Sequence, residues 1–239
     1  MEKKYKLTDE TINLNGATLY RIEALKDFGE IKKGNKGGFI ASENNLAHEG
    51  NAWVSDDACV YGSACVYGDA CVFGCACVYD NALVSGNGQV YGNARVCGNS
   101  RVYGTACVTD DACVYGDAFV RGDARVCGNA RVYNHACVHG DARVYGDALV
   151  RGYACVCGDA EISNKSDYIV FQNWWSSGRY FTWTRSNNMW SVGCFYGTGE
   201  ELIKKAYKDS ELSGREYERV VRYVESILAE EKMKHLNGS

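Results

Sequence analysis

The stretch VYGDAFVRGDARV, residues 114–126, contains a six-residue phrase of Val, Gly, Asp and Ala twice. The phrase runs with small changes through half of the chain, because valine occupies every sixth position from Val54 to Val156, eighteen times without interruption, and Ile162 continues the series. A small residue, usually alanine, stands two positions before each valine. Residues two apart in a strand face the same side. We therefore predict that the alanine and the valine point into a common interior and that the residue between them points out.

The position two residues after each valine predicts a corner in the backbone. It is glycine in most repeats, and the exceptions are all Asp or Asn: Asp56, Asp80, Asp110, Asn134 and Asn164. These are the non-glycine residues that best tolerate a positive φ, so we expect left-handed backbone at this position. Each unit is then a short strand followed by a tight corner. Strands this short cannot bury a face alone, so successive units must coil and stack as a solenoid.

The phrase V-Y-G-D-A-R and its variants resemble the hexapeptide-repeat left-handed parallel β-helix family. The resemblance implies three units per coil, a triangular cross-section, left-handed winding and often a trimer. With three units per coil, residues 52–163 make about six coils. The flanking residues 5–54 resemble the leader of uncharacterised bacterial, phage and prophage hexapeptide proteins, among them an enterobacterial branch labelled as transferases.

The composition argues against several partners. The net charge of −4 comes from interspersed acidic and basic residues, so no basic stripe is present to neutralise the phosphates of duplex nucleic acid. Proline is absent, which suits a structure in which nearly every backbone N–H donates to a ladder. No segment approaches the roughly 18 apolar residues that a membrane span requires, and the first residues lack the apolar core of a signal peptide. We expect a cytoplasmic protein whose 13 cysteines are free thiols.

The extent of the repeat predicts three domains: an N-terminal β cap over residues 1–45, the β-helix over 46–166 and a C-terminal aromatic-rich α+β domain over 167–239. The cap is expected to form short strands, with turns at residues 15–16 and 34–35, that cover the unpaired first coil. The predicted fold class is therefore mainly β: a left-handed parallel β-helix of about six triangular coils, an N-terminal β cap and a small C-terminal α+β domain.

The C-terminal domain is predicted to combine aromatic strands with two helices. The stretches DYIVFQNWW, RYFTWTR and MWSVGCFYG, within residues 167–197, are typical of strands. Two capping boxes, Thr198 with Glu201 and Ser213 with Glu216, are expected to open the helices. One face of the second helix is apolar and should pack on the sheet: Tyr217, Val220, Val221, Val224 and Leu228.

The same domain contains the residues that we expect to bind a ligand: Trp174, Trp175, Arg179, Tyr180, Trp183, Arg185 and Trp190. Most of them must form the core of so small a domain. The remainder could stack on a base or a sugar, while Arg179 or Arg185 meets a phosphate or a carboxylate.

Residues 18 apart in the repeat are expected to stack in columns on the surface of the rod. Tyrosine columns such as Tyr61 with Tyr79 are interpreted as surface ladders. Asp123, Asp141 and Asp159 stack at one corner, where a cation could screen their repulsion.

One further group has the ligand types of a structural zinc site: Cys137, His139, Cys155 and Cys157. These outward positions lie on neighbouring strands of one predicted face. Cysteine is also common at equivalent outward positions, such as Cys59, Cys77 and Cys113. Zinc binding therefore stays open, and no metal or cofactor is assigned.

No catalytic residue is carried over from enzymes of the resembled fold. Its acyltransferases typically use a histidine near a loop excursion between subunits, and a class of carbonic anhydrases uses three histidines at a trimer interface. The repeat has no excursion and contains only His135 and His139, on different corners. His48, before the repeat, is interpreted as a capping residue.

The sequence favours a non-enzymatic phage or prophage-type protein, expected to be a homotrimer, in which a rigid β-helix carries a binding domain. That domain would recognise a host protein or a small nucleotide-like ligand and so counteract a host defence. Two alternatives stay open: an acyl- or sugar-nucleotide transferase with its site between subunits, and a structural filament of coils stacked end to end. Neither duplex nucleic acid nor a membrane is an expected partner.

Overall fold

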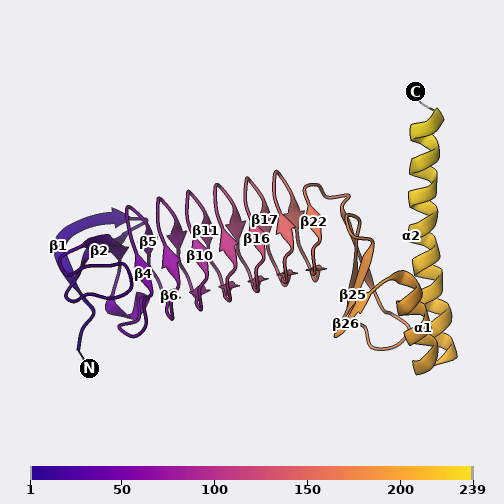
Figure 1. Cartoon of the computed structure of the whole chain (residues 1–239), viewed down its shortest axis with the longest axis horizontal. Coiled ribbons are helices and arrows are strands. Elements are labelled where there is room, and N and C mark those ends of the chain that lie inside the picture. The colour runs from indigo at the N-terminus through magenta and orange to yellow at the C-terminus, as the bar shows by residue number, and fades with distance from the viewer. Residues whose placement is uncertain (1, 238–239) are drawn as a thin grey trace. The chain divides into compact units, whose positions relative to one another are not determined.

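A computed structural model of the chain describes residues 2–237. The chain divides into two compact units, Met1–Asp167 and Tyr168–Ser239. The first is a parallel β-solenoid with an N-terminal hairpin, and the second is an antiparallel sheet with two helices (Figure 1). The predicted fold class is confirmed in these terms. The left-handed winding stays a prediction from the resemblance.

The repeat forms two-residue strands that stack on three faces of the solenoid (Figure 1). One face contains β4 (Trp53–Val54), β7 (Cys71–Val72), β10 (Gln89–Val90), β13 (Cys107–Val108), β16 (Arg125–Val126), β19 (Arg143–Val144) and β22 (Glu161–Ile162). The second contains β6 (Cys65–Val66), β9 (Leu83–Val84), β12 (Arg101–Val102), β15 (Phe119–Val120), β18 (Cys137–Val138) and β21 (Cys155–Val156). The third contains β5 (Cys59–Val60), β8 (Cys77–Val78), β11 (Arg95–Val96), β14 (Cys113–Val114), β17 (Arg131–Val132) and β20 (Leu149–Val150).

The register of the strands confirms the predicted period. Each strand pairs in parallel with the strand 18 residues further along the chain, as Val114 does with Val132. All eighteen repeat valines and Ile162 are fully buried, and so are the small residues two positions before them. The interior of the solenoid is therefore a dry stack of valine and alanine, as the alternation predicts.

The predicted left-handed corners are confirmed at four of the five non-glycine positions, which have φ between 57° and 60°: Asp56, Asp80, Asp110 and Asn134. The prediction was wrong for Asn164, which does not have a positive φ. The chain leaves the solenoid there, and the carboxylate of Asp167 accepts hydrogen bonds from the backbone N–H groups of Ser163 and Asn164 at 2.7 and 2.8 Å. This local turn replaces the corner of a further coil.

The N-terminal strands extend the stack. Strands β1 (Tyr5–Leu14) and β2 (Ala17–Ala24) form a hairpin, and β3 (Lys36–Ile40) pairs antiparallel with β2 and parallel with β5. After the short 3₁₀ helix η1 (Glu43–Asn45), Leu46 forms a parallel bridge with Val66. A first coil of β3, Leu46 and β4 therefore gives the solenoid about seven turns, where the repeats alone indicated about six.

The second unit is a four-stranded antiparallel sheet in the order β23 (Tyr168–Gln172), β24 (Tyr180–Thr184), β25 (Met189–Val192) and β26 (Phe195–Gly197). Helices α1 (Gly199–Asp209) and α2 (Glu211–Asn237) follow. The apolar face predicted for the second helix is confirmed, because Tyr217, Val221 and Val224 are buried in the core and Val220 and Leu228 pack against it. Trp183 and Trp190 lie in the same core.

The sequence predicted the start of α1 correctly and the start of α2 incorrectly. Thr198 caps α1 through the predicted capping box with Glu201. The box predicted at Ser213 was wrong, because α2 already begins at Glu211 and the hydroxyl of Ser210 accepts the N–H of Ser213. Over the described part of the chain, no helix combines the length and the apolar character that a membrane span needs.

Candidate functional site

The candidate site of the second unit is built around the loop between β23 and β24. Asn173 is 3% exposed, and its side-chain oxygen accepts hydrogen bonds from the backbone N–H and the hydroxyl of Ser176. Its amide nitrogen donates to the hydroxyl of Tyr217 at 2.9 Å, and its backbone N–H donates to the carbonyl of Arg179 at 2.7 Å. One buried amide therefore fixes the loop on α2 and holds Arg179 at its end.

A pocket of about 630 Å³ opens beside this loop. Its lining comes from the β23–β24 loop, the β25–β26 turn, helix α1 and the first residues of α2. Leu202 and Ala206 of α1, both buried, form part of its apolar wall. The lining includes the hydroxyl groups of Ser176, Ser177, Tyr196, Ser210, Ser213 and Tyr217. The size suits a small molecule, because ligand pockets in proteins span about 300–1,000 Å³.

Two cations face this pocket. Arg179 and Lys205 both line it, and neither forms an ion pair with any residue that the structure describes. Asp209, one turn after Lys205 on α1, is the single acidic residue of the lining. Since the lining contains two positive charges and one negative charge, an anionic ligand would find a net positive site there.

The hydroxyl of Tyr217 lies within reach of this charge. Burial raises the pKa of Tyr217, while the hydrogen bond from Asn173 and the positive charge of Arg179 act in the opposite direction. Trp175 packs edge-on against the Tyr217 ring at 5.0 Å between centroids, and its buried indole nitrogen has no hydrogen-bond partner among residues 2–237. The aromatic wall is thus well packed, and Tyr217 stays protonated as a donor over the physiological range.

The structure separates the seven predicted ligand-binding residues into distinct places. Trp183 and Trp190 are buried in the core, so their rings do not face solvent. Arg185 pairs with Glu231 at 2.6 Å and lies over the Trp183 ring. Arg179 lines the pocket, Trp175 lies behind Tyr217, and Trp174 and Tyr180 are exposed.

Sequence reasoning missed the residues that complete the pocket from outside the aromatic segment, chiefly Asn173, Lys205, Asp209 and Tyr217. Lys205 and Asp209 are four residues apart and therefore share one face of α1. That spacing was visible in the sequence. Which strand loop this face would meet was not, because the pairing of a helix with a loop depends on tertiary packing.

The features singled out in the repeat and just before it also have defined places. His48 accepts the N–H of Lys4 and stacks on Tyr5 at 4.4 Å, so its contacts are those of a capping residue. The tyrosine columns stack, as Tyr61 does on Tyr79 with 5.1 Å between ring centroids. Among the residues described, three metal-ligand side chains converge in one place only, at Cys137, His139 and Cys155, so Cys157 and the corner aspartates do not take part.

Comparison with known proteins bears on the first unit alone. Residues 76–92, 88–104 and 124–140 match the model of the YdcK Beta solenoid repeat. Over these segments the chain is similar to that β-solenoid repeat. No curated protein matches it. The matched segments lie in the stacked coils, so they support the architecture of the first unit and leave the pocket of the second to be judged on its geometry.

Proposed function

We propose that the protein is a non-enzymatic binding protein in which the β-solenoid is a scaffold and the C-terminal unit binds a small, anionic, nucleotide-like ligand. The observation that carries this proposal is the pair of cations, Arg179 and Lys205, which line one pocket of about 630 Å³ and form no ion pair within the described part of the chain. Arginine binds phosphate and carboxylate groups through a planar fork of donors, and lysine adds a point charge. Serine hydroxyls of the lining supply neutral donors beside them.

The aromatic residues next to the pocket support the nucleotide-like part of the ligand. Trp174 follows Asn173 directly and is 77% exposed, although most tryptophans in proteins are largely buried. An exposed indole offers a face on which a base can stack, at about 1–3 kcal/mol for each stacked base. We propose that the phosphate end of the ligand meets Arg179 and Lys205 and that its base meets Trp174.

The biological setting of this proposal follows from the resemblance to phage and prophage hexapeptide proteins. We propose that the chain forms a homotrimer through its solenoid and withholds a host nucleotide or a nucleotide-bearing host protein. The long, regular rod supports a scaffold role, because its interior is filled with valine and alanine and has no room for a ligand. Size-exclusion chromatography with light scattering would give three times the chain mass if the trimer forms, and a single chain mass would refute it.

A thermal-shift series on the full chain tests the binding proposal. AMP, ADP, cyclic nucleotides, inorganic phosphate and coenzyme A are added separately, and a binder at a hundred times its Kd adds about 2.7 kcal/mol to the free energy of unfolding. We expect one nucleotide class to raise the melting temperature, and Arg179→Gln and Lys205→Gln to reduce that shift. Lys204→Gln is the matched control, since Lys204 is exposed on α1 and outside the pocket.

Two results would contradict the proposal. If no anion shifts the melting temperature, or if the shift is the same in Arg179→Gln, Lys205→Gln and Lys204→Gln, the pocket is not the binding site. Steady turnover of an acyl-CoA or nucleotide-sugar donor would instead support the transferase alternative.

A further inference from the structure

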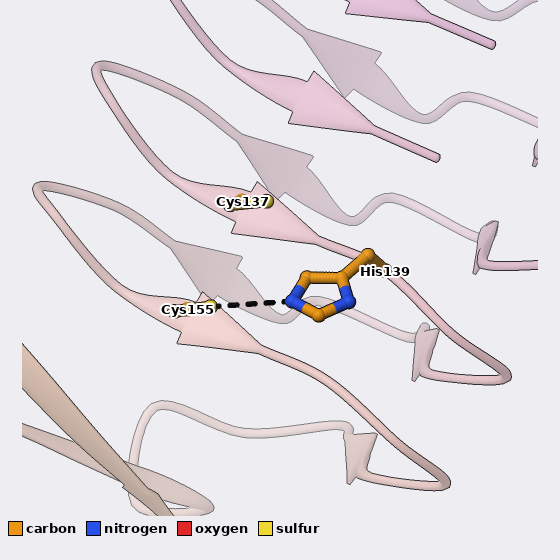
Figure 2. Close-up of side chains that lie close together, drawn as sticks. All are labelled: Cys137, His139 and Cys155. Atoms are coloured by element: carbon orange, nitrogen blue, oxygen red, sulfur yellow. Dashed lines mark hydrogen bonds between the residues drawn. The ribbon is translucent and has the colours of Figure 1, made fainter. Parts of the chain in front are cut away.

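The solenoid brings two thiols and one imidazole together on its second face. Cys137 of β18 and Cys155 of β21 are directly paired residues of neighbouring parallel strands. His139 lies two residues after Cys137, beyond the inward Val138, so both side chains point outward. Figure 2 shows the imidazole of His139 directed towards Cys155 across the gap between the two coils.

The distances in this group suit a tetrahedral metal ion. His139 Nε2 lies 3.5 Å from Cys155 Sγ, and the ligand atoms of all three residues lie within 4.8 Å of one another. Zinc binds thiolate sulfur at about 2.3 Å and imidazole nitrogen at about 2.0 Å, so a tetrahedron places S and N about 3.5 Å apart and two sulfurs about 3.8 Å apart. Only small side-chain rotations separate the observed group from that geometry.

We propose that Cys137, His139 and Cys155 bind one Zn²⁺ ion, with a fourth coordination position open to water or to an incoming ligand. Two thiolates balance the charge of the ion, and imidazole supplies the third ligand. Sets of three protein ligands with water or substrate in the fourth position are those of catalytic zinc sites, whereas structural sites use four protein ligands. The site is independent of the pocket in the second unit.

The exposure of the three side chains decides whether an ion can reach them. All three ligand side chains are partly buried, so the site is sheltered yet reachable by an ion from solvent.

Cys59, Cys77 and Cys113 each lack either the nearby imidazole or the second thiol of this group. Cys59 and Cys77 are also paired on neighbouring strands, but the residues that follow their valines are Tyr61 and Tyr79. Cys113 occupies the equivalent outward position of its repeat and is paired with Arg95 and Arg131, whose positive charges repel a cation. These positions provide internal controls within the same fold.

The full chain, kept reduced and loaded with Zn²⁺, is dialysed, and its zinc content is measured by mass spectrometry. We expect about one zinc ion per chain, and an at least tenfold loss of affinity in Cys155→Ser and His139→Ala. Cys113→Ser and His135→Gln are the matched controls and should retain the ion. Circular dichroism of each variant shows whether the solenoid is intact, so loss of zinc through misfolding is recognised.

Cobalt substitution gives a second, independent readout. Co²⁺ bound at this site should show thiolate-to-cobalt charge-transfer absorption that disappears in Cys137→Ser and persists in Cys113→Ser. Absence of zinc from the reduced, loaded wild-type chain would overturn the proposal. So would equal zinc content in Cys155→Ser and the wild type, selective retention of Cu⁺ over Zn²⁺, or a Cys137–Cys155 disulfide that forms in reducing buffer.

Discussion

The corners of the solenoid decide how closely successive coils approach, and Gly98 offers the sharpest test of this. Gly98 has a φ of 70°, and a Cβ atom on it would lie 2.8 Å from the backbone nitrogen and 2.9 Å from the carbonyl oxygen of Gly116 in the next coil. Gly152 has nearly the same φ, 68°, but a Cβ there would meet nothing within 4 Å. Alanine at either position carries left-handed strain of about 1–2 kcal/mol. Only Gly98→Ala also forces fixed backbone apart, which adds about 1–3 kcal/mol.

We therefore expect Gly98→Ala to lose about 3 kcal/mol of unfolding free energy and Gly152→Ala about 1 kcal/mol. A larger substitution at the same place should be milder. At the corner before Gly98 in the same column, Asp80 accepts the N–H of Gly98 through its carboxylate at 3.1 Å. Gly98→Asp would offer the same acceptor to the N–H of Gly116, and a hydrogen bond of this kind contributes about 1 kcal/mol. Gly98→Asp should thus be more stable than Gly98→Ala.

Urea unfolding followed by circular dichroism measures the loss in each variant. Repeat proteins can unfold in parts, so amide hydrogen exchange of peptides covering residues 94–118 should be measured in parallel, because it reports opening at this corner directly. Equal losses in Gly98→Ala and Gly152→Ala would refute the argument from close approach. A Gly98→Asp variant that is less stable than Gly98→Ala would refute the argument from the carboxylate.

Three further predictions concern the ends and the core. Burial lowers the pKa of Lys4 from 10.5 to about 8, so between these pH values the unfolded chain binds more protons than the folded chain. The free energy of unfolding of the wild type, relative to that of Lys4→Met, should therefore rise with pH over this range, by up to about 3 kcal/mol. Denaturant titrations at several pH values measure this difference. Val114→Ala removes fully buried methyl groups and should lower the free energy of unfolding in urea by about 2 kcal/mol. No loss of stability would mean that neighbouring side chains fill the cavity. Thr198→Ala removes the N-cap of α1 and should lower the unfolding free energy of the second unit by about 1 kcal/mol. The fluorescence of the buried Trp183 and Trp190 follows this unfolding. An unchanged midpoint would show that Glu201 alone caps the helix.

The solenoid could be predicted from the sequence because one rule acts at every repeat. Val114 and Val132 face inward for the same reason, and their pairing 18 residues apart follows once three units make a coil. The prediction failed where the rule stops acting. Asn164 stands at a corner position, but no further coil follows to support that corner, so the carboxylate of Asp167 decides the local turn instead.

The sites were predicted less completely, for physical reasons. The Cys137, His139 and Cys155 group followed from the 18-residue spacing, since strand neighbours are fixed by it. Cys157 has the same spacing from His139 yet lies outside the group, because spacing fixes neighbours and not the direction of a side chain. The pocket at Lys205 depends on how a helix meets a strand loop, and no short-range pattern encodes that contact.

The direction of the backbone ladder explains the chemistry of both ends of the solenoid. Each coil donates its N–H groups to carbonyls of the next coil, as Tyr115 does to Val132, so the carbonyls of the first coil and the N–H groups of the last coil need partners from outside this ladder. At the first end, Lys4 donates to the carbonyls of Gly50 and Ala52, and Asn45 donates to those of Gly62 and Ala64. At the last end, the carboxylate of Asp167 accepts two backbone N–H groups. Side-chain donors thus satisfy backbone carbonyls at one end and a side-chain acceptor satisfies backbone N–H groups at the other, which is how exposed strand edges are commonly protected from pairing with another chain.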